Sequence, residues 1–181
     1  MVQISGGYHN RDIDKAGPEL FVNFGSAQRS WGIAEWLLEE AIYPVVSTSL
    51  KETLVHPRDV LEHRLIDVDG HKVNWASLLK SQGINSALSA EYMHVDSTEI
   101  ALAMAASGYG IALARTPITD SMLESYGLVP CPGFEPVAAR EGYYLMYRSE
   151  KALSVGAKKF RQWLLAQLQS ESEGRIFRGA Q

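Results

Sequence analysis

Residues 96–114 read DSTEIALAMAASGYGIALA and predict a helix that leads directly into a buried strand. Asp96 and Glu99 match a capping box, with Asp96 as the N-cap and Glu99 as the third helical residue. Gly108 is the expected end of the helix. The apolar run 110–114 is typical of a strand buried on both faces. Together they indicate one α/β unit.

The same alternation extends on both sides of this stretch, from residue 47 to about 136. Turn signals separate a short helix at 56–63, a strand at 65–68, a helix at 74–82, a strand at 87–95 and a helix at 119–125. We therefore expect an inserted α/β lobe.

The flanking segments predict further strands and a final helix. Strands are expected at 2–5, 19–24, 36–46 and 142–148, and a helix at 153–169. Glu39 and Glu40 interrupt the third of these strands, and Pro44 suits an edge or a crossover. The Pro-rich stretch that ends at Pro136 is a second candidate crossover.

Composition excludes several classes of protein. The chain has 181 residues and a net charge of −4, which is the wrong sign for binding phosphates. Its one cysteine, Cys131, allows no internal disulfide and fits a reducing cytoplasm. The start shows no secretory signal, and the charge-free run 100–114 is too short to span a membrane. We expect a cytoplasmic globular protein.

Motifs for catalysis or metal binding are incomplete. Ser77 and Lys80 match Ser-x-x-Lys without its companion motifs, and Gly108-Tyr109-Gly110 lies at a helix end, the reverse of a dinucleotide fingerprint. Asp67 and Asp69 begin a calcium-like loop that lacks its final acid. The five histidines have no metal-ligand spacing, and Cys131 has no nearby activating group. We expect no metal, no cofactor and no catalytic residue.

From residue 13 onward, a series of segments occurs in a fixed order: LFVNFG (20–25), WG (31–32), LEEAIYPVVS (38–47), PRDVL (57–61), LI (65–66), Trp75, the helix-to-strand unit 101–114, GLV (127–129), GYYLMY (142–147) and FRQWLL (160–165). This order resembles the effector-binding region of LysR-type transcriptional regulators. The Trp-rich sequence is similar to the branch that contains the glycine-cleavage activator.

This resemblance implies an α/β fold of the type 2 periplasmic-binding-protein kind, with two Rossmann-like lobes joined by two crossover strands and a small-molecule site in the cleft between them. Lobe I would comprise residues 1–46 and 138–181, and lobe II residues 47–137. The family's winged helix-turn-helix has no counterpart in residues 1–181, nor do the first strand and helix of lobe I. We therefore expect lobe I to be incomplete at its N-terminus, as in a truncated product.

The resemblance also implies ligand-binding residues: Gly25 and Ser26 in lobe I, Ser97 and Thr98 in lobe II, and Tyr143 on the returning strand. Ser97 and Thr98 could present hydroxyls and backbone N–H groups to a carboxylate, and Tyr143 a phenol to the opposite end. Each residue also has a purely structural interpretation: a strand-ending turn, a helix cap or core packing.

The resulting hypothesis is a non-enzymatic sensor of an amino acid or small organic acid. Self-association as a homodimer is expected, with DNA contacted only through a helix-turn-helix domain outside this chain and with no membrane partner. Three alternatives stay open: a free-standing solute-binding protein, an enzyme that uses Cys131 or Ser77, and a fragment without function.

Overall fold

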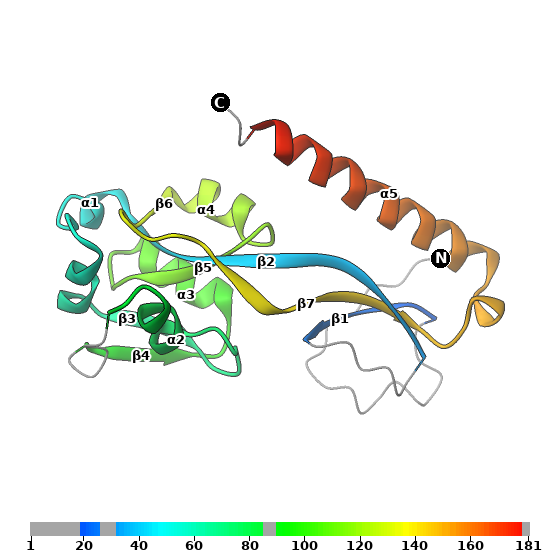
Figure 1. Cartoon of the computed structure of the whole chain (residues 1–181), viewed down its shortest axis with the longest axis horizontal. Helices are drawn as coiled ribbons and strands as arrows, with labels where there is room; N and C mark the ends of the chain where they lie inside the picture. Colours follow the sequence, from blue (N-terminus) through cyan, green and yellow to red (C-terminus); the bar gives the residue numbers. More distant parts are fainter. Residues whose placement is uncertain (1–18, 26–31, 85–89, 179–181) are drawn as a thin grey trace. The chain divides into compact units, whose positions relative to one another are not determined.

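Two long strands, β2 (Ile33–Ser47) and β7 (Val137–Tyr147), carry the sheet (Figure 1). The structure, a computed structural model, describes residues 19–25, 32–84 and 90–178. The remaining elements, in chain order, are β1 (Phe21–Gly25), α1 (Thr48–Lys51), the 3-10 helix η3 (Pro57–Glu62), β3 (Leu65–Val68), α2 (Trp75–Ser81), β4 (Tyr92–Val95), α3 (Thr98–Ala106), β5 (Ala112–Thr116), α4 (Asp120–Tyr126), β6 (Leu128–Pro130), the 3-10 helix η5 (Glu150–Ala152) and α5 (Val155–Arg178).

The chain divides into two compact units, and both long strands pass from one to the other. Unit 1 comprises Met1–Leu38 and Tyr143–Gln181, and unit 2 comprises Glu39–Gly142. The boundary therefore falls inside β2 and inside β7. We call these two the crossover strands.

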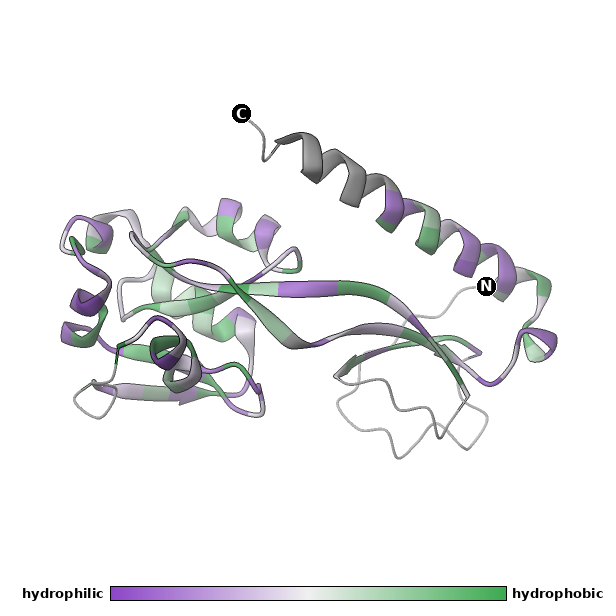
Figure 2. Ribbon diagram, in the orientation of Figure 1, coloured by the Kyte–Doolittle hydropathy of each residue, from purple (hydrophilic) through white to green (hydrophobic). Residues whose placement is uncertain are grey.

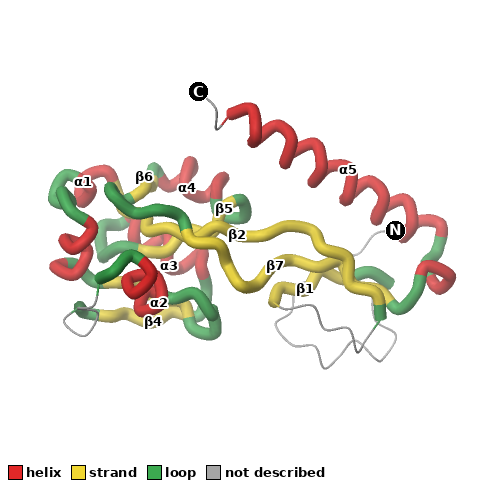
Figure 3. The backbone as a smooth tube through the Cα atoms, in the orientation of Figure 1, coloured by secondary structure: helices red, strands yellow, loops and turns green. Residues whose placement is uncertain are grey.

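Parallel and antiparallel pairings meet in unit 2. β3 pairs with β4 in parallel, and an isolated parallel bridge joins Leu65 to Ile111, just before β5. β5 then pairs antiparallel with β2, from Ala41↔Thr116 to Val45↔Ala112, and the sheet order is β1-β7-β2-β5 with β6 also on β2. Figure 3 shows the strands of unit 2 in yellow and its helices in red.

Side chains that alternate along the unit 2 strands build a core on each face of the sheet. Leu65 and Ile111 pack with Trp75, Leu78 and Leu79 of α2. Their neighbours Ile66 and Ala112 pack in a different cluster, with α3 and with Leu123 of α4. Since successive residues of a strand point to opposite faces, α2 lies on one face and α3 and α4 lie on the other.

In unit 1, helix α5 packs against the sheet. Ala157 and Leu164 of α5 contact the cluster that contains Leu145 and Tyr147 of β7 and Leu37 of β2. Arg161 forms an ion pair with Glu35, and this guanidinium lowers the pKa of the Glu35 carboxyl. The expected helix 153–169 is present, and it continues to Arg178.

The expected interruption of a strand at Glu39 and Glu40 is wrong. β2 is continuous from Ile33 to Ser47, and Figure 2 shows the hydrophilic segment midway along it. Glu40 stays in the strand because its carboxylate is 1% exposed and paired with Arg115.

Pro44 lies within a strand that is paired on both sides. Its carbonyl accepts a hydrogen bond from the Cys131 N–H at 2.9 Å, on the β6 side. The N and O atoms of one strand residue face the same neighbour, so the missing N–H of proline leaves the ladder to β5 intact.

Other boundaries differ by a few residues from those expected. The strand predicted at 110–114 is β5 at 112–116, the strand at 142–148 begins already at 137, and the strand at 87–95 starts only at Tyr92. The helices at 74–82 and 119–125 and the strand at 65–68 are confirmed to within a residue. The strand expected at 2–5 lies outside the described residues.

Candidate functional site

Two neighbouring strands of unit 2, β3 and β4, end at the same edge of their sheet. β3 and β4 run parallel and end together at Val68↔Val95, and the bridge from Leu65 to Ile111 gives β5 the same direction. The chain leaves β3 toward α2 and leaves β4 toward α3, on opposite faces of the sheet. Open α/β sheets bind ligands outside the carboxyl ends of strands whose connections diverge in this way. We call this the carboxyl edge.

Ser97 and Thr98 lie at this edge, at the start of α3. Ser97 is the N-cap, and its hydroxyl oxygen accepts a hydrogen bond from the Ile100 N–H at 3.2 Å. The expected cap at Asp96 is therefore wrong, because the shorter Ser97 side chain takes the position and shifts the helix start by one residue. Both side chains are half-buried, and the first N–H groups of a helix have no acceptor within it.

Gly25 and Tyr143 lie in unit 1. The Tyr143 ring contacts Phe24, with 5.0 Å between ring centroids, and Phe24 directly precedes Gly25 at the end of β1. Gly25 has φ = +136°, a conformation that favours glycine. Ser26 lies outside the described residues. The structure thus brings Tyr143 next to the end of β1 and places Ser97 and Thr98 in the other unit.

A buried ion pair in unit 2 was not foreseen from the sequence. The Arg115 guanidinium donates to Glu40 at 2.8 Å, and the two side chains are 5% and 1% exposed. Arg115 also donates to the Val73 carbonyl at 2.9 Å. Its backbone N–H donates to the Thr119 hydroxyl. The pair therefore joins β2, β5 and the loop before α2.

His71 lies in this same loop and is neutral at ordinary pH. Burial, together with the positive charge of Arg115, lowers its pKa to about 4, against the opposing effect of Glu141. The next residue, Lys72, pairs with Glu141 of β7 at 3.2 Å. Charged groups from both crossover strands thus face this one loop.

Asp67 and Asp69 flank the end of β3. Burial raises the pKa of Asp67, whose carboxylate accepts from the Trp75 N–H at 3.4 Å. Asp69 is exposed and pairs with His94 at 3.1 Å. Among the described residues, no group of three or more His, Cys, Asp and Glu is placed to hold a metal ion.

The surroundings of Cys131 and Ser77 indicate that both residues have structural roles. Cys131 is buried, and burial raises the pKa of its thiol to about 12, so it is protonated at neutral pH. The Ser77 hydroxyl accepts from the Asn74 N–H at 3.0 Å and donates to the Asn74 carbonyl at 2.9 Å, as part of the α2 cap. Neither geometry activates a nucleophile.

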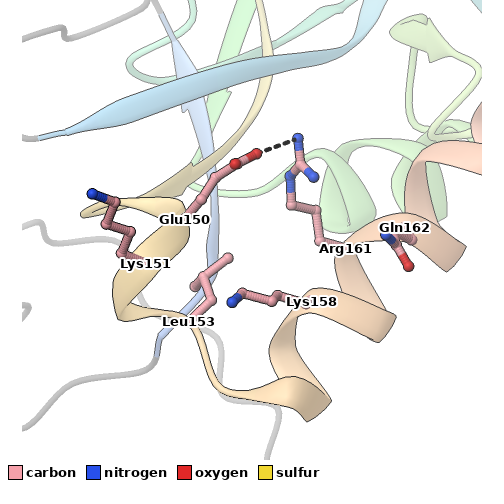
Figure 4. A pocket seen from close by; sticks show the side chains of 6 residues that line it. All are labelled: Glu150, Lys151, Leu153, Lys158, Arg161 and Gln162. Atoms are coloured by element: carbon pink, nitrogen blue, oxygen red, sulfur yellow. Dashed lines mark ion pairs between the residues drawn. The ribbon is translucent and has the colours of Figure 1, made fainter.

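Two shallow cavities lie elsewhere. One, of about 360 Å³, lies in unit 1, where Glu150 and Arg161 face each other at 3.7 Å beside Leu153 (Figure 4). The other, of about 390 Å³, is lined by residues of unit 2 that include His56, Gln82 and Gly133. Neither cavity contains a residue that the sequence predicted for ligand binding.

Comparison with known proteins yields a family and several relatives. Residues 17–169 match the family described as LysR substrate binding domain. The chain is 28% identical over 174 residues to the glycine cleavage system transcriptional activator of Escherichia coli K12, and 22% identical over 168 residues to the transcriptional activator AmpR of Yersinia enterocolitica. These alignments cover 93% and 91% of this chain but 56% of each relative, so the chain spans about half their length.

Solved structures agree with this match. The effector domain of AmpR from Pseudomonas aeruginosa superposes with a TM-score of 0.77 at 22% identity, covering 91% of this chain and 79% of that one. The AmpR effector-binding domain from Citrobacter freundii gives a TM-score of 0.72 at 20% identity, covering 84% and 75%. The expected periplasmic-binding-protein-like fold is confirmed.

Proposed function

This chain belongs to the LysR substrate-binding domain family, and we propose that it senses an amino acid or a small organic acid. As a member of this family it is the effector-binding domain of a LysR-type regulator. One observation supports an effector that bears a carboxylate: the N-terminus of α3 lies at the carboxyl edge.

The start of α3 suits a carboxylate for two reasons. Aligned peptide dipoles place roughly half a positive charge at a helix N-terminus, and the free N–H groups there can donate to an anion. Thr98, the first residue of α3, adds a hydroxyl donor beside them. Asp96 and Glu99 are both exposed, so water and salt screen their repulsion of the ligand. Ser97 and Thr98 are therefore the proposed carboxylate partners.

In unit 1, the family resemblance supports Gly25, Ser26 and Tyr143 as proposed effector-binding residues. Gly25, at the end of β1, has φ = +136°, and the Tyr143 ring contacts the preceding residue, Phe24. A phenol can donate to or accept from a second polar group, such as an amine or another carboxylate.

We further propose that the domain has no catalytic activity. The relatives are named as transcriptional regulators, and the capped Ser77 hydroxyl and buried Cys131 thiol give no support for a nucleophile. Replacing either residue by alanine is expected to leave effector binding unchanged.

The relatives, which are named as transcriptional activators and are longer than this chain, support a proposal about macromolecular partners. We propose a longer, cytoplasmic regulator in which a helix-turn-helix domain outside residues 1–181 contacts DNA and the effector domains associate as a homodimer. In the described ranges every helix is too short or too polar to cross a bilayer.

Calorimetric titration of residues 1–181 with a panel of amino acids and organic acids tests the effector class. We expect at least one acid to bind, and Thr98→Val to weaken that binding about tenfold or more, as expected for a hydrogen bond to a charged group. Thr48→Val is the matched control, because Thr48 is the first residue of another helix, α1. Equal affinity of the two variants, or no binding from the whole panel, would contradict the proposal.

A further inference from the structure

Residues 70–74, in the loop between β3 and α2, are held directly by a carboxylate of β7 and, through Arg115, by a carboxylate of β2. Glu141 of β7 accepts from Lys72 twice, from its ammonium at 3.2 Å and from its backbone N–H at 3.4 Å. Glu40 of β2 holds the Arg115 guanidinium at 2.8 Å, and the same guanidinium donates to the Val73 carbonyl at 2.9 Å. We call residues 70–74 the relay loop.

These carboxylates lie where the crossover strands leave unit 2. The unit boundary runs between Leu38 and Glu39 in β2 and between Gly142 and Tyr143 in β7. Glu40 is thus the second residue of unit 2 on one strand, and Glu141 is the second from its end on the other. A change in the conformation of the relay loop would therefore alter the contacts of both strands at these points.

The other end of the relay loop is tied to the carboxyl edge. The N–H of Asp69, directly before the loop, donates to the Val95 carbonyl at 2.9 Å, and the Asp69 carboxylate pairs with His94 at 3.1 Å. Val95 ends β4 and lies two residues before Ser97. A continuous series of bonded groups therefore connects the start of α3, through the loop, to both crossover strands.

We propose that the relay loop couples the start of α3 to β2 and β7, with Glu40, Lys72, Arg115 and Glu141 as positioning residues. Its use by an effector rests on the proposed function, whereas the coupling between the strands does not. A buried ion pair such as Glu40–Arg115 often stabilises a fold no better than a well-packed apolar pair would. This comparison favours a role for the pair beyond stabilising the fold.

Amide exchange measured by NMR on residues 1–181, without effector, tests the coupling. The variants are Lys72→Ala, Glu141→Ala and the double variant. Lys72 is 54% exposed and Glu141 is 11% exposed, so thermal melts check that each variant still folds. Glu141→Gln is a milder second variant, since its amide oxygen can still accept from the Lys72 N–H. Glu91→Ala is the matched control, because it breaks the exposed Arg64–Glu91 pair in the same unit.

We expect each single variant to speed exchange at residues 40–42 of β2 by about two- to fivefold or more, since one partner of the pair is exposed and the other is mostly buried. The double variant should add nothing beyond Glu141→Ala, because that change alone already removes both contacts between β7 and Lys72. Glu91→Ala should change nothing at these residues. Unchanged exchange at 40–42 in both single variants would overturn the proposal. So would effects that multiply in the double variant, since Glu141 would then act on β2 without the loop. Because no effector is present, failure of the effector proposal leaves this result unaffected.

Discussion

At the scale of single residues, the Glu40–Arg115 pair joins β2, β5 and the loop before α2. Both side chains are almost fully buried, and Arg115 also holds the Val73 carbonyl. Removing one member of such a pair leaves the other charge in a poorly solvated site.

Arg115→Met is therefore expected to lower the free energy of unfolding by about 3–5 kcal/mol. The double variant Glu40→Gln with Arg115→Met should recover part of that loss, because it leaves no unpaired charge. Urea unfolding of the wild type and the variants measures both quantities. A double variant as unstable as Arg115→Met would show that the charge of Glu40 is not the cause.

His71 makes stability depend on pH. Its pKa is about 4 in the folded chain and 6.5 ordinarily, so the unfolded chain binds more protons between these values. The stabilisation is fully present above about pH 6.5 and is lost progressively as the pH falls toward 4. We expect the wild type to lose about 1–2 kcal/mol more than His71→Asn between pH 7 and pH 5, measured by urea unfolding at both values. Equal losses of unfolding free energy in the wild type and in His71→Asn would show that folding does not lower the pKa of His71.

Residue patterns predicted the local contacts better than the distant ones. The helix start at 96–99 was visible because a cap is written within four consecutive residues, although the cap is Ser97. Glu40 and Arg115 are 75 residues apart, and sequence alone reads Glu40 as a polar break in a strand. The one signal available in the sequence was that Arg115 directly follows the apolar run 110–114.

At the scale of elements, α3 combines a structural and a proposed binding role in adjacent residues. Ser97 caps the helix through its hydroxyl, whereas no capping bond of the Thr98 side chain is present in the described residues. The two roles can therefore be separated by substitution.

Ser97→Ala should cost about 1 kcal/mol of folding free energy, the usual loss for a serine N-cap, while Thr98→Val should change stability by a few tenths. Denaturant midpoints of the two variants give the comparison. Equal destabilisation would mean that Ser97 does not act as the cap.

The strands show why element boundaries were harder to predict than element order. β2 and β7 are longer than their apolar runs because their charged residues find partners: Glu40 meets Arg115, and Glu141 meets Lys72. Hydrophobic periodicity detects burial against apolar neighbours and cannot detect a charge that is buried as a pair. β7 was consequently predicted too short, and β2 was predicted with an interruption that it does not have.

At the scale of the whole molecule, the alternation of helices and strands predicted an α/β fold, and the order of segments indicated its family. The carboxyl edge depends on topology, since α2 and α3 must leave neighbouring strands toward opposite faces. No local pattern encodes that divergence. Ser97 and Thr98 were found through the family resemblance, and their place at this edge supports the proposed carboxylate site.

The central claim is that the start of α3 recognises a carboxylate. The most direct measurement is the melting temperature of residues 1–181 with each amino acid and organic acid of the panel, and with the corresponding primary amide. A ligand that binds only the folded chain raises the melting temperature by mass action. We predict that at least one acid raises it and that its amide, which lacks the negative charge, does not. Equal shifts with acid and amide, or no shift with any acid, would contradict the claim.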